Sequence, residues 1–381
     1  MIYLDYAAST PMSDEAIAVY TKVAQKFFGN SGSIHDYGSS AQRITDAARE
    51  KIGACINAGP RGIFFTGSGS ESNQLSIISL AIANRHKGRH IITTGAEHSS
   101  VRNTMEVLQD EGFEITYTPL LSSGKVDPDR LEQNIREDTI LASIQHGNSE
   151  IGTVQDINAI GALLEQHDIL FHSDCVQTFG KIPVDVQEAR LDSISVSAHK
   201  IYGPKGVGAV YINPSANWRP VIPGTTQEKG FRAGTVDVPG IAAFMAAAQA
   251  AVEQMDAAYE REQALRDHFV EELLQLPFKI TLEGDPVEHL PNIIGLRIHG
   301  MEGQYAMLEC NRHGLAISTG SACTVGTEKA SASMVALNRT EQEAREFIRL
   351  SLGKHTTLAE IDQSVAILKK VLTQYFSMVK L

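Results

Sequence analysis

The chain has 381 residues, of which 43% are hydrophobic and 20% are charged, and 31 are glycines. This composition is typical of an ordinary soluble enzyme and excludes a disordered or fibrous protein. The 33 basic and 45 acidic residues leave a net charge of −12, which argues against nucleic acid or an anionic membrane surface as a partner. No apolar run reaches the length of a membrane span and no secretory signal pattern opens the chain, so we expect a cytoplasmic protein without a membrane partner.

Two helices are expected first, over residues 13–28, with Ser13 as N-cap, and over residues 39–57. The Gly/Ser-rich loop between them makes Asn30 a candidate for the wall of a polar site. Five apolar segments follow, and helical stretches separate most of them. The segments span residues 63–66, 91–94, 140–144, 169–172 and 191–196. Strands that alternate with helices predict an α/β fold with a mostly parallel sheet sandwiched by helices.

Polar residues follow each of the five expected strands. Because ligands of such sheets bind outside the carboxyl ends of the strands, we expect these polar clusters to share one site. The clusters are Gly67-Ser-Gly-Ser-Glu-Ser72, Glu97-His98, His146-Gly-Asn-Ser149, Asp174 with Gln177, and Ser197-Ala-His-Lys200.

The last third of the chain has a different pattern. A long helical stretch over residues 240–276 leads to a region in which a strand (293–298) is followed by helices (303–311 and 341–347). We predict a large domain of residues 13–250 and a smaller α+β domain formed by residues 1–12 together with residues 251–381.

Lys200 could be a solvated loop lysine or a lysine that forms a Schiff base. Asp174 could cap a helix or keep the nitrogen of a pyridine ring protonated, and His98 could be a core histidine or stack on such a ring. Lys200 with Asp174 is the combination that pyridoxal phosphate requires. The loop Gly67-Ser-Gly-Ser70 suits a single phosphate, because it lacks the last glycine of G-x-G-x-x-G and the lysine of a P-loop.

The four cysteines are widely spaced and include no C-x-x-C pair or Cys/His cluster, so we expect no metal site. Cys323 lies in a loop of small residues and is the candidate nucleophile. Cys55 and Cys310 have the pattern of buried residues, and Cys175 should point away from the site. Arg349, in a strand-like run, is either a surface arginine or a fork for a substrate carboxylate.

These motifs resemble the NifS/IscS-like cysteine desulfurases, a branch of the class-V aminotransferases with the fold type I of pyridoxal-phosphate enzymes. The likeness extends over essentially the whole chain. The stretches that carry it are Tyr3-Leu-Asp-Tyr-Ala-Ala8, Phe65-Thr-Gly-Ser-Gly-Ser-Glu-Ser-Asn73, Glu97-His98, His146-Gly-Asn-Ser-Glu-Ile-Gly152, Asp174-Cys-Val-Gln177, Ser197-Ala-His-Lys-Ile-Tyr-Gly-Pro-Lys-Gly206, Arg232-Ala-Gly-Thr235, Ser321-Ala-Cys323 and Arg349-Leu-Ser-Leu-Gly353.

The resemblance implies a cytoplasmic homodimer that converts L-cysteine to L-alanine. Its sulfur would pass through a persulfide on an enzyme cysteine to an acceptor protein, in iron–sulfur cluster assembly or in tRNA or cofactor thiolation. Lys200 would form the Schiff base, His98 would stack on the ring and shuttle protons, and Cys323 would be the nucleophile. The other cofactor-binding residues would be Gly69, Ser70, Ser149, Asp174, Gln177, Ser197, His199 and, from the partner subunit, Thr235. Asn30 and Arg349 would hold the substrate carboxylate.

Two positions depart from the family pattern. Where many members have Asn-Asn-Glu, this chain has Asn148-Ser149-Glu150, so either the Ser149 hydroxyl or Gln177 alone would bond the ring oxygen. Lys354, followed by His355, stands at an arginine-like position after Ser-Leu-Gly. Two other functions are considered: a transaminase or β-lyase of the same fold, which needs no cysteine nucleophile, and a cofactor-binding or sulfur-carrying protein without catalysis.

Overall fold

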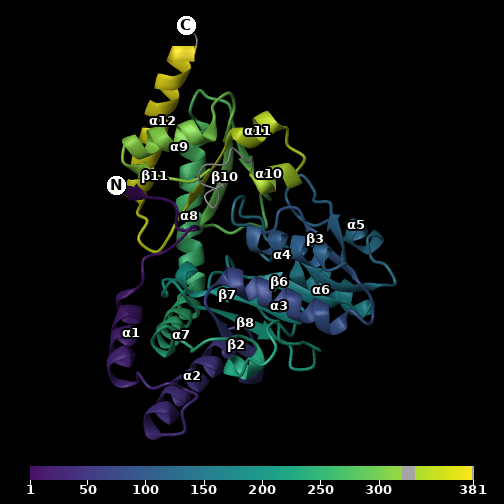
Figure 1. Ribbon diagram of the computed structural model, residues 1–381. Helices are drawn as coiled ribbons and strands as arrows, with labels where there is room; N and C mark the ends of the chain where they lie inside the picture. The colour runs from purple at the N-terminus through teal and green to yellow at the C-terminus, as the bar shows by residue number, and fades with distance from the viewer. Residues whose placement is uncertain (320–330, 380–381) are drawn as a thin grey trace.

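A seven-stranded sheet forms the centre of the larger part of the molecule (Figure 1) in the computed structural model, which describes residues 1–319 and 331–379. The strands are β2 (Ile63–Thr66), β3 (His90–Thr94), β4 (Glu114–Thr118), β5 (Thr139–Ser143), β6 (Leu170–Asp174), β7 (Ser193–Ser197) and β8 (Gly208–Ile212). They lie in the order β2-β8-β7-β6-β5-β3-β4. Among these seven described strands, β8 runs in the direction opposite to the other six, so the predicted mostly parallel sheet is confirmed.

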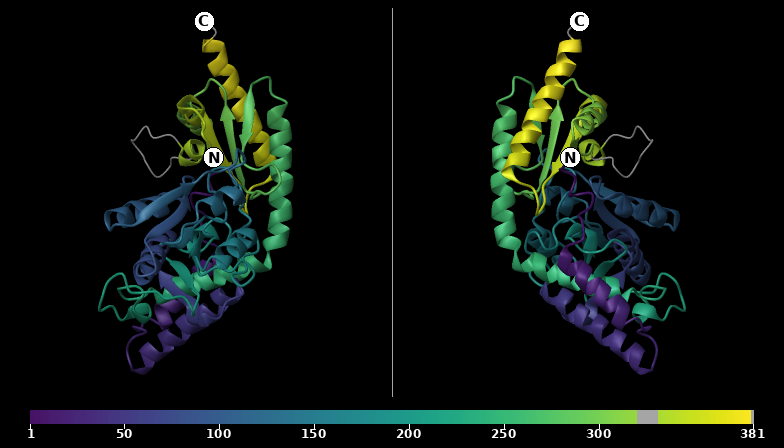
Figure 2. Two further views of the ribbon diagram at one scale, coloured as in Figure 1. Left: turned by 90° about the vertical axis from the view of Figure 1, so that its right-hand side faces the viewer. Right: turned by 90° about the vertical axis from the view of Figure 1, so that its left-hand side faces the viewer.

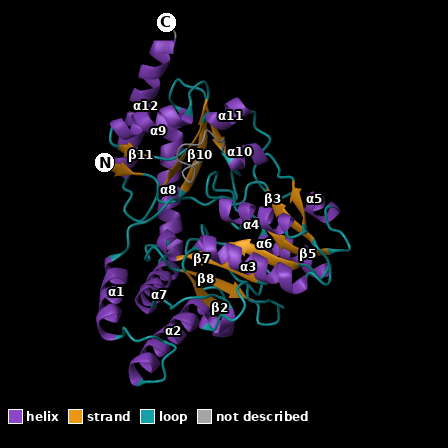
Figure 3. Ribbon diagram, in the orientation of Figure 1, coloured by secondary structure: helices purple, strands orange, loops and turns teal. Residues whose placement is uncertain are grey.

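Helices cover both faces of this sheet (Figure 3). They are α2 (Asp36–Ala54), α3 (Gly69–Asn84), α4 (Ser99–Asp110), α5 (Pro128–Gln133), α6 (Ile157–Gln166) and α7 (Val238–Glu253). Helix α1 (Asp14–Lys26) packs outside them, in a small core shared with α2 and α7. Successive side chains of a strand point to opposite faces, and Phe64 and Phe65 of β2 accordingly belong to two different hydrophobic cores. The core of Phe65 includes α2, α6 and α7, whereas the core of Phe64 includes α3 and α4.

The smaller part of the molecule brings the two ends of the chain together. Leu4 packs in one core with Phe269 and Leu372. The elements are β1 (Ile2–Tyr3), α8 (Met255–Leu274), β9 (Ile280–Glu283), β10 (Ile293–Ile298), α9 (Gly303–Arg312), β11 (Leu315–Ala316), α10 (Ala332–Ala336), α11 (Glu341–Arg345), β12 (Phe347–Ser351) and α12 (Leu358–Val379). β12, β10 and β9 form an antiparallel sheet in that order, and β1 pairs in parallel with β11. Because of this shared core, we propose residues 1–12 and 251–381 as one small domain beside a large domain of residues 13–250.

The prediction of a single helix over residues 240–276 is wrong. The chain forms two helices, because it leaves the helical conformation at Gln254, with φ −103° and ψ 4°. Helix α7 places Phe244 in the core of the large sheet, whereas α8 places Phe269 in the core of the small part. Figure 2 shows α8 as the long helix that runs along the side of the molecule between the two parts. The turn at Gln254 therefore lets adjacent helices serve different cores.

Several other elements differ from expectation, and two of the differences concern the sheets. The helix expected over residues 341–347 ends at Arg345, because Phe347 already pairs with Arg297 of β10 as the first residue of β12. Strand β4, at the edge of the large sheet, was not predicted. No helix within residues 1–319 and 331–379 combines the length and the apolarity needed to cross a bilayer.

Candidate active site

The carboxyl ends of five strands of the large sheet surround one cavity of about 250 Å³. The loops after β2, β3, β5, β6 and β7 all contribute to its lining, as the sequence predicted for this edge of the sheet. The cavity brings together nine of the predicted site residues, Gly69, Ser70, His98, Ser149, Asp174, Gln177, Ser197, His199 and Lys200.

Lys200 ends a single 3₁₀ turn that follows β7. Its Nζ donates to the backbone oxygens of Ala7, at 2.6 Å, and Ala8, at 2.9 Å. The segment that supplies these oxygens is tied to the same turn, because Thr10 N and Thr10 Oγ1 both donate to His199 O, at 3.0 and 2.9 Å. Lys200 is therefore held at the wall of the cavity and is not a solvated loop lysine.

Asp174 is the last residue of β6 and is only 7% exposed. Its Oδ1 accepts from Val176 N at 2.9 Å, and its Oδ2 accepts from Asn73 Nδ2 at 2.7 Å. Gln177, one turn further, donates from Nε2 to Ala7 O at 3.0 Å. Asp174 thus stabilises a local turn rather than a helix start, and each of its two oxygens accepts a hydrogen bond.

Helix α3 begins at the cavity wall, at Gly69, and the first N–H groups of a helix can bind an anion. A Cβ atom at Gly69 would lie 2.6 Å from Val176 Cγ2 and 3.2 Å from Ser197 Cβ, so the close approach requires glycine. Ser197 Oγ is buried and has no hydrogen-bond partner within the described residues. A phosphate group would supply that partner, and the residues present therefore fit pyridoxal phosphate.

The two histidines of the cavity are neutral at neutral pH. Burial, as the largest cause, lowers the pKa of His98, whose Nδ1 accepts from Ser100 N at 3.2 Å. Burial, together with the positive charge of Lys200, lowers the pKa of His199 to about 4. A neutral imidazole can stack on a ring or donate one hydrogen bond to a phosphate, as the site would require.

Of the four other predicted site residues, three lie away from this cavity. Asn30 and Thr235 are exposed and line a different cavity, of about 850 Å³. Arg349 is buried in β12, and its guanidinium donates to Ser149 O at 2.9 Å and to Asp5 Oδ1 at 2.7 Å. Cys323 lies outside the described residues.

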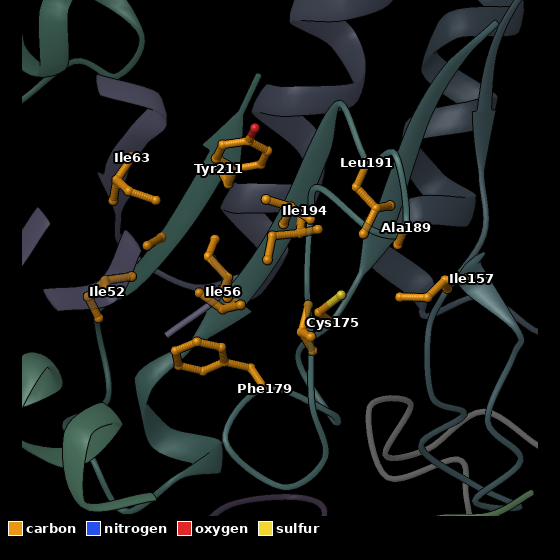
Figure 4. Packing of buried hydrophobic residues seen from close by; sticks show 14 of the residues in the cluster. Ile52, Ile56, Ile63, Ile157, Cys175, Phe179, Ala189, Leu191, Ile194 and Tyr211 are labelled. Carbon is orange, nitrogen blue, oxygen red and sulfur yellow. The ribbon is translucent and has the colours of Figure 1, made fainter. Parts of the chain in front are cut away.

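Two other cysteines are excluded as nucleophiles by burial. Cys175 packs in the core of the large sheet, in the cluster that contains Ile56 and Phe179 (Figure 4). Burial raises the pKa of Cys175 and that of Cys310 to about 12. Both thiols are therefore protonated and inaccessible.

The sequence assigned no role to three polar residues near the cavity. Asn73 lines it and lies one turn after Gly69 on α3, a spacing that could have revealed it. Gln145 also lines it and donates from Nε2 to Ala96 O at 2.8 Å. Glu97 accepts from Gln145 N at 3.0 Å and is 2% exposed. The sequence named it only as the neighbour of His98 in one of the polar clusters.

The sheet edge, the lysine and the phosphate-sized helix start define a pyridoxal-phosphate enzyme. A model of the class-V aminotransferase family, whose cofactor is pyridoxal phosphate, matches residues 2–363. A NifS-type relative from Bacillus subtilis (strain 168) is 48% identical over 365 residues, which are 95% of this chain and 92% of the relative. The cysteine desulfurase IscS of Dictyoglomus turgidum is 40% identical over 371 residues, 97% of this chain and 94% of that protein.

A solved structure of SspA in complex with cysteine is also similar, with 32% identity and a TM-score of 0.82 over 94% of this chain and 100% of that chain. Within the class-V aminotransferases, the chain belongs to the NifS/IscS-like cysteine desulfurases, as its motifs predicted.

Proposed function

We propose that this protein is a pyridoxal-phosphate-dependent cysteine desulfurase that converts L-cysteine to L-alanine and transfers the sulfur to Cys323. The observation that supports it most is the convergence of Lys200, Asp174 and His98 on one cavity beside the start of α3. The similar proteins named as cysteine desulfurase IscS and as SspA in complex with cysteine support cysteine as the substrate.

Bound at Lys200, pyridoxal phosphate supplies an electron sink for bonds at the substrate Cα. Asp174 would keep the ring nitrogen protonated, and Gln177, with or without the Ser149 hydroxyl, would donate to the ring oxygen. The first N–H groups and hydroxyl of α3, the unpartnered Ser197 Oγ and His199 would hold the phosphate. The residues at the start of α3 are Gly69 and Ser70.

Lys200 and His98 move the protons. Lys200 Nζ, held over the cavity by two backbone oxygens, is placed to take the proton from the substrate Cα. His98 Nδ1 already accepts from Ser100 N, so the imidazole proton is on Nε2. We assign to this Nε2–H the delivery of a proton to the substrate Cβ, and to Lys200 the return of its proton to Cα.

Sulfur transfer needs only the thiolate of Cys323 as a co-reactant. An S–S bond forms between Cys323 Sγ and the substrate sulfur while the substrate Cβ–S bond breaks. The electrons of the broken bond remain on carbon, which takes a proton and becomes the methyl group of alanine. The products are alanine and a persulfide on Cys323, which an acceptor protein of iron–sulfur cluster assembly or thiolation then takes.

The substrate carboxylate is assigned to Arg349. Two of its nitrogens bind Ser149 O and Asp5, and its Nε is buried without a hydrogen-bond partner among the described residues. An unsatisfied buried donor of this kind is costly, and a carboxylate would satisfy it. Asn30 and Thr235 are exposed beside a separate cavity, and we propose that both act in the site of the partner subunit of a homodimer.

Alanine formation from L-cysteine tests the proposal. The Cys323→Ser variant should lose turnover, and the Lys200→Ala variant should lose both turnover and the covalently attached cofactor. Cys55→Ser is the matched control, because Cys55 is a partly exposed thiol that does not line the cavity. Undiminished alanine formation in Cys323→Ser would exclude Cys323 as the nucleophile, whereas consumption of L-cysteine by the wild type without alanine would indicate a lyase or transaminase.

A further inference from the structure

Asp174 and His98 are the two side chains proposed to touch the cofactor ring. Asn73 of α3 contacts Asp174 directly and His98 through Ser100. Its Nδ2 donates to Asp174 Oδ2 at 2.7 Å and to Ser100 Oγ at 3.0 Å. Ser100 Oγ in turn lies 2.8 Å from His98 Nδ1. Asn73 is 1% exposed, so these hydrogen bonds form away from water. One amide therefore connects the carboxylate for the ring nitrogen with the histidine for the ring face.

The direction of the hydrogen bonds at His98 follows from the backbone. Ser100 N can only donate, and it lies 3.2 Å from His98 Nδ1, so this nitrogen carries no proton. The Ser100 hydroxyl must then also donate to Nδ1, and it accepts from Asn73 with its oxygen. The amide of Asn73 thus favours the His98 tautomer with its proton on Nε2.

Asp174 and His172 together orient the amide of Asn73. Because the carboxylate of Asp174 can only accept, Nδ2 of Asn73 faces it and Oδ1 faces His172 Nε2, at 3.2 Å. His172 is fully buried, and burial lowers its pKa to about 3, so it is neutral. Its one proton is then on Nε2, which donates to Asn73 Oδ1, while Nδ1 accepts from the Ser193 hydroxyl at 3.1 Å. A reversed amide would instead place its oxygen against the carboxylate of Asp174.

We propose that Asn73 is a positioning residue: oriented by Asp174 and His172, it holds Asp174 as a carboxylate at the ring nitrogen and His98 as the Nε2–H tautomer. Every hydrogen bond from Ser193 through His172 and Asn73 donates toward Asp174, which is the arrangement that a carboxylate stabilises. The inference rests on the proposed binding of pyridoxal phosphate in this cavity.

The Asn73→Leu variant tests it, because the side chain keeps nearly its size and adds no charge but loses the NH₂ group that faces Asp174. The variant should bind pyridoxal phosphate at least about tenfold more weakly, the size expected for loss of a hydrogen bond to a buried charge. The ¹⁵N resonance of the ring nitrogen in labelled cofactor should move from its protonated toward its unprotonated position. Asn84→Leu is the matched control: Asn84 is buried on the same helix and donates to Leu80 O and Asn217 O, both at 2.9 Å.

A second variant keeps the inference testable if the Asn73 variant does not fold. His172→Phe leaves Asn73 in place but removes the donor to its Oδ1, and it should change the affinity and the ¹⁵N resonance in the same directions. Wild-type affinity and a protonated ring nitrogen in either folded variant would overturn the inference, as would the same change in Asn84→Leu. If the wild type formed no borohydride-reducible link between cofactor and Lys200, the proposed function would fail first, and the inference with it.

Discussion

At the residue scale, Glu97 shows how strongly the cavity wall excludes water. Its Oε1 accepts from Thr94 Oγ1 at 2.8 Å and from Gln145 N at 3.0 Å, whereas its Oε2 has no hydrogen-bond partner in the described part of the chain. Burial first, and the charge of Asp174 in addition, raises the pKa of Glu97 to about 8. The side chain is therefore mostly protonated at neutral pH and adds little negative charge beside Asp174.

Glu97→Gln should stabilise the protein increasingly as the pH rises. Between pH 4.5 and pH 8 the folded wild type holds a proton that the unfolded chain releases, so its free energy of unfolding falls as the pH rises through this window. Glutamine copies the protonated form and avoids this loss, which reaches roughly 3–5 kcal/mol because one pKa unit corresponds to about 1.4 kcal/mol. Urea unfolding at pH 5, 6.5 and 8 measures the difference in free energy of unfolding between Glu97→Gln and wild type, with Glu132→Gln, at an exposed position, as control. A difference that does not widen as the pH rises would contradict the raised pKa of Glu97.

At the element scale, the predictable parts are those that local sequence determines. Strand β2 has the expected bounds, because a buried strand appears as an apolar run that ends at a glycine. Strand β4 was missed because it lies at the sheet edge and most of its side chains are at least partly exposed. The turn at Gln254 could not be predicted either, since it results from two separate cores and not from a helix-breaking residue.

Gly69→Ala tests the start of α3 as the phosphate site. The added methyl group would meet Val176 Cγ2 at 2.6 Å and force the helix start away from Ser197. Overpacking of this kind costs about 1–3 kcal/mol, so the dissociation constant for pyridoxal phosphate should rise roughly tenfold. Gly59→Ala is the control, because nothing lies within 4 Å of a Cβ atom there. Titration of the apoenzyme with pyridoxal phosphate measures the affinity. Equal affinity in the two variants would show that the start of α3 does not bind the phosphate.

At the scale of the whole molecule, the cavity depends on segments from both ends of the chain. The backbone oxygens of Ala7 and Ala8 accept hydrogen bonds from Lys200 Nζ. The guanidinium of Arg349, in β12, donates to Asp5 Oδ1 and to Ser149 O. The motifs predicted most of the residues that meet there, because the carboxyl ends of parallel strands share one sheet edge. They did not predict the role of Asn73, since its partners Asp174 and His172 lie about a hundred residues away in sequence.

Mixed dimers test whether Thr235 serves the partner's site. A dimer of one Lys200→Ala chain and one Thr235→Val chain keeps a single site with both native residues if Thr235 acts across the interface. That dimer should then form alanine as fast as a dimer of Lys200→Ala with wild type, which also keeps one intact site. If Thr235 acted within its own chain, the mixed dimer would contain no intact site, and its rate would be only the mean of the two parent variants. Thr235 is exposed and does not line the cavity of Lys200 in its own chain, so we expect the faster rate.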